Sequence, residues 1–219
     1  MKTFLDDHKN TKFDNIWVTS DMHFRHDNVI KFESIREELR LKENFDGTPD
    51  EYLIHKWNEQ VGENDLVLNL GDLHWKSYDK IDGKLNGTQL LILGNHDSKP
   101  QYYEKFKDLY VVEGIWEVGE RVVQYYVDGE LAKDKLLSAL IYKDKMFSHY
   151  PIHNEYDPIY LRNSKIIKRT EYLKKLSDDL KLKHNYCGHL HSTAPDNIDT
   201  TNTCIDFNKF KMIKITLEF

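Results

Sequence analysis

Residues 89–97 read Gln-Leu-Leu-Ile-Leu-Gly-Asn-His-Asp. The run of four apolar residues, Leu90–Leu93, predicts a short buried strand. Gly94 then allows a tight turn, and three side chains that can bind metals or carry protons follow at once. In α/β sheets, sites form outside the carboxyl ends of strands. This stretch therefore predicts a functional loop at the edge of a sheet.

The same arrangement recurs at four other places in the chain. Each place has a predicted strand or hairpin with residues of metal-binding type directly after it. These places are 16–19 followed by Asp21 and His23, 65–70 followed by Gly71 and Asp72, the hairpin 136–148 followed by His149, and 184–187 followed by Gly188, His189 and His191. Mixed ligation by Asp, His and Asn suits divalent ions such as Mn²⁺, Fe²⁺, Zn²⁺ or Ni²⁺.

The remaining segments alternate between strand and helix patterns. Thr48, Pro49 and Glu51 form a capping box that predicts a helix start, and residues 164–182 have the spacing of an amphipathic helix. Further strands are expected in 111–127, 203–207 and 212–217. Short strands interspersed with helices predict an α/β sandwich with two sheets at the core and helices outside, formed by residues 1–219 as a single domain.

Composition narrows the function classes. The chain has 219 residues and a formal net charge of −6, so a chain-wide basic surface for nucleic acid is absent. No apolar run approaches the roughly 20 residues of a membrane span. With two cysteines and no signal-peptide pattern at the start, we expect a cytoplasmic protein. Residues 161–183 carry a local excess of basic residues, which fits either a solvated helix face or a patch that attracts phosphate.

The ordered set Asp-x-His, Gly-Asp, Gly-Asn-His-Asp, His and Gly-His-x-His resembles the calcineurin-like metallophosphoesterase superfamily. Residues 19–30, Thr-Ser-Asp-Met-His-Phe-Arg-His-Asp-Asn-Val-Ile, are similar to its small bacterial and phage phosphoesterases. The resemblance implies a four-layer α/β/β/α sandwich and a hydrolase acting on phosphoric esters.

The resemblance also implies a site with two divalent ions, most simply Mn²⁺. One ion would be held by Asp21, His23, Asp72 and His191, and the other by Asp72, Asn95, His149 and His189. A hydroxide generated from water between the ions would attack phosphorus. His96 would protonate or steady the leaving oxygen, and Asp97 would orient the His96 ring.

Weaker candidates for substrate contact are Arg25, His26, Asn28 and His74. For His26 and Asn28 a helix-capping role is an equal alternative, and Trp75 is expected to pack rather than to line the rim. The Arg that protein phosphatases of this superfamily carry after Gly-Asp is missing. We therefore expect phosphodiesters to be preferred over monoesters, with a small nucleotide or a nucleic-acid end as substrate. The alternatives are a catalytically silent scaffold of the same fold and a nuclease; the oligomeric state stays open.

Overall fold

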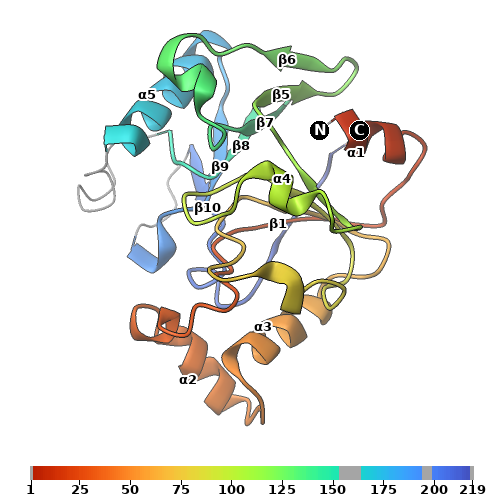
Figure 1. Ribbon diagram of the computed structural model, residues 1–219, viewed down its shortest axis with the longest axis vertical. Helices are drawn as coiled ribbons and strands as arrows, with labels where there is room; N and C mark the ends of the chain where they lie inside the picture. The colour runs from red at the N-terminus through yellow and green to blue at the C-terminus, as the bar shows by residue number, and fades with distance from the viewer. Residues whose placement is uncertain (1, 153–163, 194–198, 218–219) are drawn as a thin grey trace.

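Two β-sheets lie at the centre of the protein, as a computed structural model that describes residues 2–152, 164–193 and 199–217 shows (Figure 1). The helices are α1 (Lys2–His8), α2 (Ile35–Lys42), α3 (Pro49–Asn58), α4 (Pro100–Tyr103) and α5 (Ser164–Asp179). The strands are β1 (Ile16–Thr19), β2 (Leu66–Asn69), β3 (Thr88–Leu91), β4 (Leu109–Val111), β5 (Ile115–Val118), β6 (Val123–Tyr125), β7 (Ala139–Tyr142), β8 (Lys145–Ser148), β9 (His184–Cys187), β10 (Thr200–Asn202) and β11 (Ile213–Ile215). Short 3₁₀ helices lie at Val29–Lys31, Tyr78–Lys80, Gly129–Lys133 and His191–Thr193.

The first sheet has the strand order β11-β1-β2-β3-β4. Strands β1 to β4 are parallel, in a register that pairs Ile16 with Leu66 and Leu66 with Thr88. Strand β11 closes this sheet antiparallel to β1. The carboxyl ends of β1, β2 and β3 consequently lie side by side at one edge.

The second sheet has the order β10-β9-β8-β7-β5-β6. Strands β7 and β8 form the expected antiparallel hairpin, with Ala139 opposite Ser148. Strands β8 and β9 are parallel. Their carboxyl ends therefore also meet at one edge, and this edge carries His149 and the residues after Cys187.

The burial pattern shows how the layers stack. In β2, Leu66 and Leu68 face a core between the two sheets, which Leu140 of β7 and Phe147 of β8 complete. Val67, between those two leucines, faces the opposite side, against Tyr52 and Trp57 of α3. On the outer face of the second sheet, Ile166 and Leu173 of α5 pack against Ile115 and Met146. This order of helix, sheet, sheet and helix confirms the predicted sandwich, with α3 and α5 at opposite ends of the molecule (Figure 1).

One predicted strand is wrong. The strand in this region, β10, is Thr200–Asn202; beyond it Cys204 forms only an isolated bridge with Ser20, and residues 205–210 form a turn. The side chain of Asn208 donates to the carbonyl groups of Asn202 and Cys204, and the Asn202 side chain accepts from the Cys204 amide. These contacts satisfy backbone groups that a strand would need for pairing.

Two further features bear on the sequence predictions. The capping box at Thr48 is present, with the Glu51 amide donating to Thr48 Oγ1 and the Glu51 carboxylate accepting from the Thr48 amide. None of the helices in the described part of the chain has the length and hydropathy that a bilayer crossing requires.

Candidate metal centre

The two sheets bring together every sequence-predicted ligand. Asp21 and His23 follow β1, Asp72 follows β2, and Asn95 follows β3. From the second sheet, His149 follows β8, and His189 and His191 follow β9. The side chains of Asp21, His23, Asp72, His149 and His189 are buried. Parallel strand ends from both sheets thus build one polar cluster.

The backbone of this cluster is left-handed at most of the ligand positions. The φ angles are 57° at Asp21, 47° at His23, 54° at Asp72, 70° at His189 and 48° at His191. Non-glycine residues rarely adopt this region, and each costs on the order of 1–3 kcal/mol. Such strain persists where it aims side chains at a functional site. At these five ligand positions the chain therefore turns away from the extended path of the preceding strand.

Two glycines leave room for the carboxylates. A Cβ atom at Gly94 would lie 2.2 Å from Asp72 Oδ1, and one at Gly188 would lie 2.7 Å from Asp21 Oδ2. Any side chain at these positions would displace a carboxylate. Gly94 and Gly188 are therefore part of the site even though they offer no ligand atom.

The first group of ligand atoms gathers around His23. Its Nε2 lies 3.3 Å from His191 Nε2 and 3.7 Å from Asp72 Oδ2. His191 Nε2 lies 3.8 Å from Asp21 Oδ1. Two ligands that each lie about 2.0–2.2 Å from one ion are separated by roughly 3–4 Å. The donor set of Asp21, His23, Asp72 and His191 fits a divalent cation.

A second group gathers on the other side of Asp72. His149 Nε2 lies 3.6 Å from Asp72 Oδ2 and 3.1 Å from Asn95 Oδ1. His149 Nδ1 donates to the Leu70 carbonyl at 2.8 Å, which leaves Nε2 as the nitrogen that carries a lone pair. The His189 ring lies beside His149, with centroids 5.1 Å apart.

The electrostatics of the cluster favour a cation. Burial, together with the charges of Asp21 and Asp97, raises the pKa of Asp72 well above its ordinary value. Burial lowers the pKa of His23 well below normal and that of His149 to about 3, so both rings are neutral at pH 7. The neutral imidazoles offer lone pairs to a divalent ion, and the charge of such an ion would balance the negative charge of the buried carboxylates.

His96 lies at the mouth of the cluster. Its side chain is 37% exposed, and its Nε2 lies 4.0 Å from Asp72 Oδ2. The His96 amide donates to Asp72 Oδ1 at 2.9 Å, which turns Oδ2 of the same carboxylate toward His23 and His149. Burial lowers the pKa of His96.

The Asp97 carboxylate bonds to the backbone of two ligand loops. Its carboxylate accepts hydrogen bonds from the backbone amides of Asp72 and Gly94, both at 2.8 Å, and from Leu73 at 2.9 Å. Tyr103 adds its hydroxyl at 3.2 Å. With its oxygens so engaged, Asp97 joins the loop after β2 to the loop after β3. These contacts show that Asp97 shapes the ligand loops; that it also orients the His96 ring stays a prediction.

Sequence reasoning missed a buried charged network behind the first ligand group. Arg36 of α2 makes a bidentate ion pair with Asp206, at 2.7 and 2.8 Å, and donates to the carbonyls of Asp21 and Met22. Glu33 Oε1 lies 3.3 Å from His191 Nδ1. Neither charge stands out in the sequence, because charged residues are ordinary in and next to a helix such as α2, and their partners lie more than 150 residues away.

The four weaker candidates for substrate contact have different surroundings in the structure. His26 is part-exposed and stacks on Trp75 at 4.1 Å, and the Arg25 guanidinium donates to the Ser77 carbonyl. Asn28 takes the N-cap position of a 3₁₀ helix without a side-chain cap bond. His74 is buried and bonds to the Tyr103 hydroxyl, whereas Trp75 is 45% exposed. The expectation for this pair is therefore reversed: Trp75 lies on the rim, and His74 packs.

The basic segment 161–183 is described only in part. Residues 161–163 lie outside the described residues, and the rest belongs largely to α5. At least four of its cations are in ion pairs. Lys168 pairs with Glu130 at 2.9 Å and Arg169 with Asp134 at 2.6 Å, and Lys174 pairs with Asp178 at 2.6 Å and Lys183 with Asp144 at 3.6 Å. A cavity of about 590 Å³ between α5 and residues 130–136 extends to Asp97 and Lys99.

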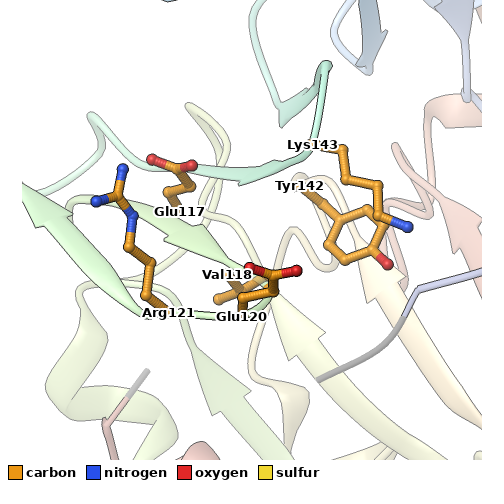
Figure 2. A pocket seen from close by; sticks show the side chains of 7 residues that line it. Glu117, Val118, Glu120, Arg121, Tyr142 and Lys143 are labelled. Atoms are coloured by element: carbon orange, nitrogen blue, oxygen red, sulfur yellow. The ribbon is translucent and has the colours of Figure 1, made fainter.

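A second cavity lies far from the ligands. It has a volume of about 650 Å³, and Figure 2 shows Glu117, Arg121, Tyr142 and Lys143 around it. Tyr142 pairs with Lys145 at this end of the β7–β8 hairpin, whereas Ser148, which precedes His149, lies at the other end. This cavity is thus separate from the candidate metal centre.

Comparison with known proteins assigns the family. Residues 15–193 match the profile of the calcineurin-like phosphoesterases. The chain is 30% identical to the Gene 66 protein of Mycobacterium phage L5 over 145 residues, 58% of this chain and 64% of that protein. It is 35% identical to Uncharacterized protein MJ1445 of Methanocaldococcus jannaschii over 97 residues, 42% of this chain and 50% of that protein. The chain thus spans less than two thirds of the length of these curated relatives.

A solved structure shares the fold. The crystal structure of AQ665, a protein of unknown function from Aquifex aeolicus, superposes with a TM-score of 0.58 over 91% of this chain and 95% of that chain, at 20% identity. That likeness extends over both sheets, and the family match covers the segment that carries all the candidate ligands. This chain belongs to the calcineurin-like phosphoesterase family.

Proposed function

We propose that the chain is a phosphodiesterase that works with two divalent ions. The observation that supports this most directly is the position of Asp72 Oδ2. It lies 3.7 Å from His23 Nε2 on one side and 3.6 Å from His149 Nε2 on the other. One carboxylate oxygen between two donor groups is what a pair of ions sharing a ligand needs.

In this proposal the ligands divide into two sets. Asp21, His23, Asp72 and His191 would hold one ion, and Asp72, Asn95, His149 and His189 the other. Bound divalent ions would supply charge neutralisation at the phosphoryl oxygens and an activated water. The protein's own part is to hold the donors rigidly: Asp97 fixes the loops after β2 and β3, and the His149 ring is fixed by its bond to the Leu70 carbonyl.

His96 is the proposed general acid. Its side chain is more exposed than that of His191, 37% against 20%, and it lies next to the shared carboxylate, so its Nε2 can reach a substrate in the mouth of the site. A proton given to the departing alkoxide lowers the barrier most when that alkoxide is a poor leaving group. This suits a diester with an unactivated ester arm.

Two features support a diester in preference to a monoester. The protein-phosphatase Arg that follows Gly-Asp is replaced here, since the chain reads Gly71-Asp72-Leu73-His74-Trp75-Lys76. The wall of the cavity beside α5 carries six basic residues against three acidic ones, and this excess of positive charge suits a second ester arm. Both features fit a substrate with one negative charge at the scissile phosphorus and more chain beyond it.

The test compares bis-p-nitrophenyl phosphate with p-nitrophenyl phosphate at one Mn²⁺ concentration, before and after chelation. We expect two bound ions per chain, a higher kcat/KM for the diester, and loss of activity with chelator. Asp72→Asn should lose both ions, while the exposed Asp82→Asn should keep them. One ion per chain, or a clear preference for monoesters, would contradict the proposal.

A further inference from the structure

Four aromatic rings run from the surface to the mouth of the metal centre. We call Phe32, His26, Trp75 and His96 the aromatic track. Successive ring centroids are 6.5 Å apart for Phe32 and His26, 4.1 Å for His26 and Trp75, and 4.6 Å for Trp75 and His96. The His26 and Trp75 planes differ by only 7°. One end of the track is the proposed general acid, and the other is open to solvent.

Two rings of the track, Phe32 and Trp75, expose much of their apolar surface to solvent. Phe32 is 75% exposed and Trp75 is 45% exposed, whereas Trp57 and Trp116 are buried. Exposed apolar surface costs free energy, so a cluster of it beside a catalytic centre points to a ligand that covers it. Trp75 stacks on His26, and Phe32 lies next to the same ring, yet both residues keep a large exposed area.

The track is also held in place by the backbone. The Trp75 amide donates to the Phe24 carbonyl at 2.9 Å, and Phe24 and His74 form a parallel bridge. Arg25 joins the same two segments through its bond to Ser77 at 3.0 Å. A preorganised aromatic surface binds a flat ligand without an ordering cost.

We propose that the aromatic track binds a nucleobase of the substrate, so that the diester cleaved at the metal centre is a nucleotide or an unpaired nucleic-acid end. The inference rests on the proposed function for the position of the scissile phosphate. Every nucleobase has a flat ring that can stack on an aromatic side chain. This stacking strengthens binding by about 5- to 150-fold per base. Arg25 beside the track supplies a cation suited to the adjoining phosphate.

The experiment measures binding, not turnover. Adenosine 5′-monophosphate and ribose 5-phosphate differ only in the base, so they are titrated into Mn²⁺-loaded protein and followed by tryptophan fluorescence and calorimetry. We expect the adenosine compound to bind at least about 5-fold more tightly and to quench fluorescence. Tighter binding of an adenosine tetranucleotide would assign the track to a nucleic-acid end, and equal binding would assign it to a mononucleotide.

Variants locate the effect. Trp75→Leu and Phe32→Leu should each reduce the preference for the base, Trp75→Phe should retain most of it, and Tyr126→Leu, at an exposed aromatic outside the track, should leave it unchanged. If Trp75→Leu does not fold, Phe32→Leu carries the test alone. Equal binding of the two ligands to the wild type, or full preference in both leucine variants, overturns the inference. Base-independent binding with intact diester hydrolysis would refute the track and leave the proposed function standing, whereas base-dependent binding without hydrolysis of any ester would do the reverse.

Discussion

Glu33 Oε1 lies 3.3 Å from Nδ1 of His191, while Nε2 of the same ring points toward Asp21 and His23. Burial alone would lower the pKa of His191, but the hydrogen bond to Glu33 and the charge of Asp21 outweigh it and raise that pKa. A carboxylate on the outer nitrogen fixes the orientation of a ligand ring and makes it a stronger base. The second group has no such carboxylate on His149, whose Nδ1 bonds to a backbone carbonyl instead.

This asymmetry predicts that Glu33→Gln weakens one ion and spares the other. Loss of the charged partner of a ligand His typically costs 10–100-fold in metal affinity, and we expect about 10-fold for the first ion. Competition with a chromophoric chelator measures both affinities. Glu37→Gln, which removes a surface pair with Arg40, serves as the matched control. Equal weakening of both ions, or of neither, would contradict the assignment.

The hydrogen bonds of Asp97 predict that Asp97→Asn destabilises the folded protein. In Asp97→Asn an amide NH₂ would face backbone donors that now meet a carboxylate, and each buried donor left without an acceptor costs about 1–3 kcal/mol. We expect the free energy of unfolding to fall by about 3 kcal/mol, measured by urea denaturation of the metal-free protein.

Tyr103→Phe provides the comparison for Asp97. It leaves the three amides bonded to Asp97 but removes a hydroxyl that also bonds to His74 Nε2 and accepts from the Ser98 amide, so it should cost about 2 kcal/mol, less than Asp97→Asn. An Asp97→Asn protein as stable as the wild type, with only catalysis impaired, would contradict the structural role and support the predicted role of orienting His96.

The sequence predicted the strands and the clustering of ligands because each buried strand ends directly in its ligand residue. Leu90–Leu93 leads into Asn95 and His96, and that order alone places them at a sheet edge. The contacts of Glu33 and Arg36 could not be predicted in this way. Their partners, His191 and Asp206, lie about 160 residues along the chain and meet them only after both sheets have formed.

The burial of His74 in place of Trp75 could not be predicted for a similar reason. The residues are adjacent, so their order in the sequence does not say which one is buried. Phe24 and His74 form an isolated bridge, which sets the direction of both side chains. A larger apolar residue is ordinarily the better candidate for burial, and here tertiary pairing overrides that preference.

A pH effect on stability is expected far from the metal centre, at Asp65. Its carboxylate accepts from Asn15 and Trp17, both at 2.8 Å, and from the Gly62 amide at 2.9 Å. Burial acts to raise the pKa of Asp65, but these donors outweigh it, so the pKa is lowered. A lowered pKa in the folded state adds stability above the unfolded value of about 3.9, and this is lost as the pH falls through the folded value.

Asp65→Asn should therefore destabilise the protein by about 2 kcal/mol at pH 7. The difference from wild type should shrink below about pH 4, because both proteins then carry a neutral group at this position. Urea denaturation at pH 7, 5 and 3.5 measures it, with the exposed Asp82→Asn as control. A difference that does not change with pH would show that the charge of Asp65 has no role.

His96→Ala separates metal binding from proton transfer. The His96 ring lies outside both proposed ligand sets, so the variant should keep two ions per chain, measured by metal analysis after gel filtration. General acid help typically contributes 10²–10⁴-fold, and we expect that loss for a diester with an alkyl leaving group. For a nitrophenyl leaving group, which needs little protonation, the loss should be much smaller. Because the ring also packs on Trp75, thermal unfolding of the variant must match the wild type for the comparison to hold. A variant that loses metal, or that slows both esters equally, would remove His96 from the role of general acid.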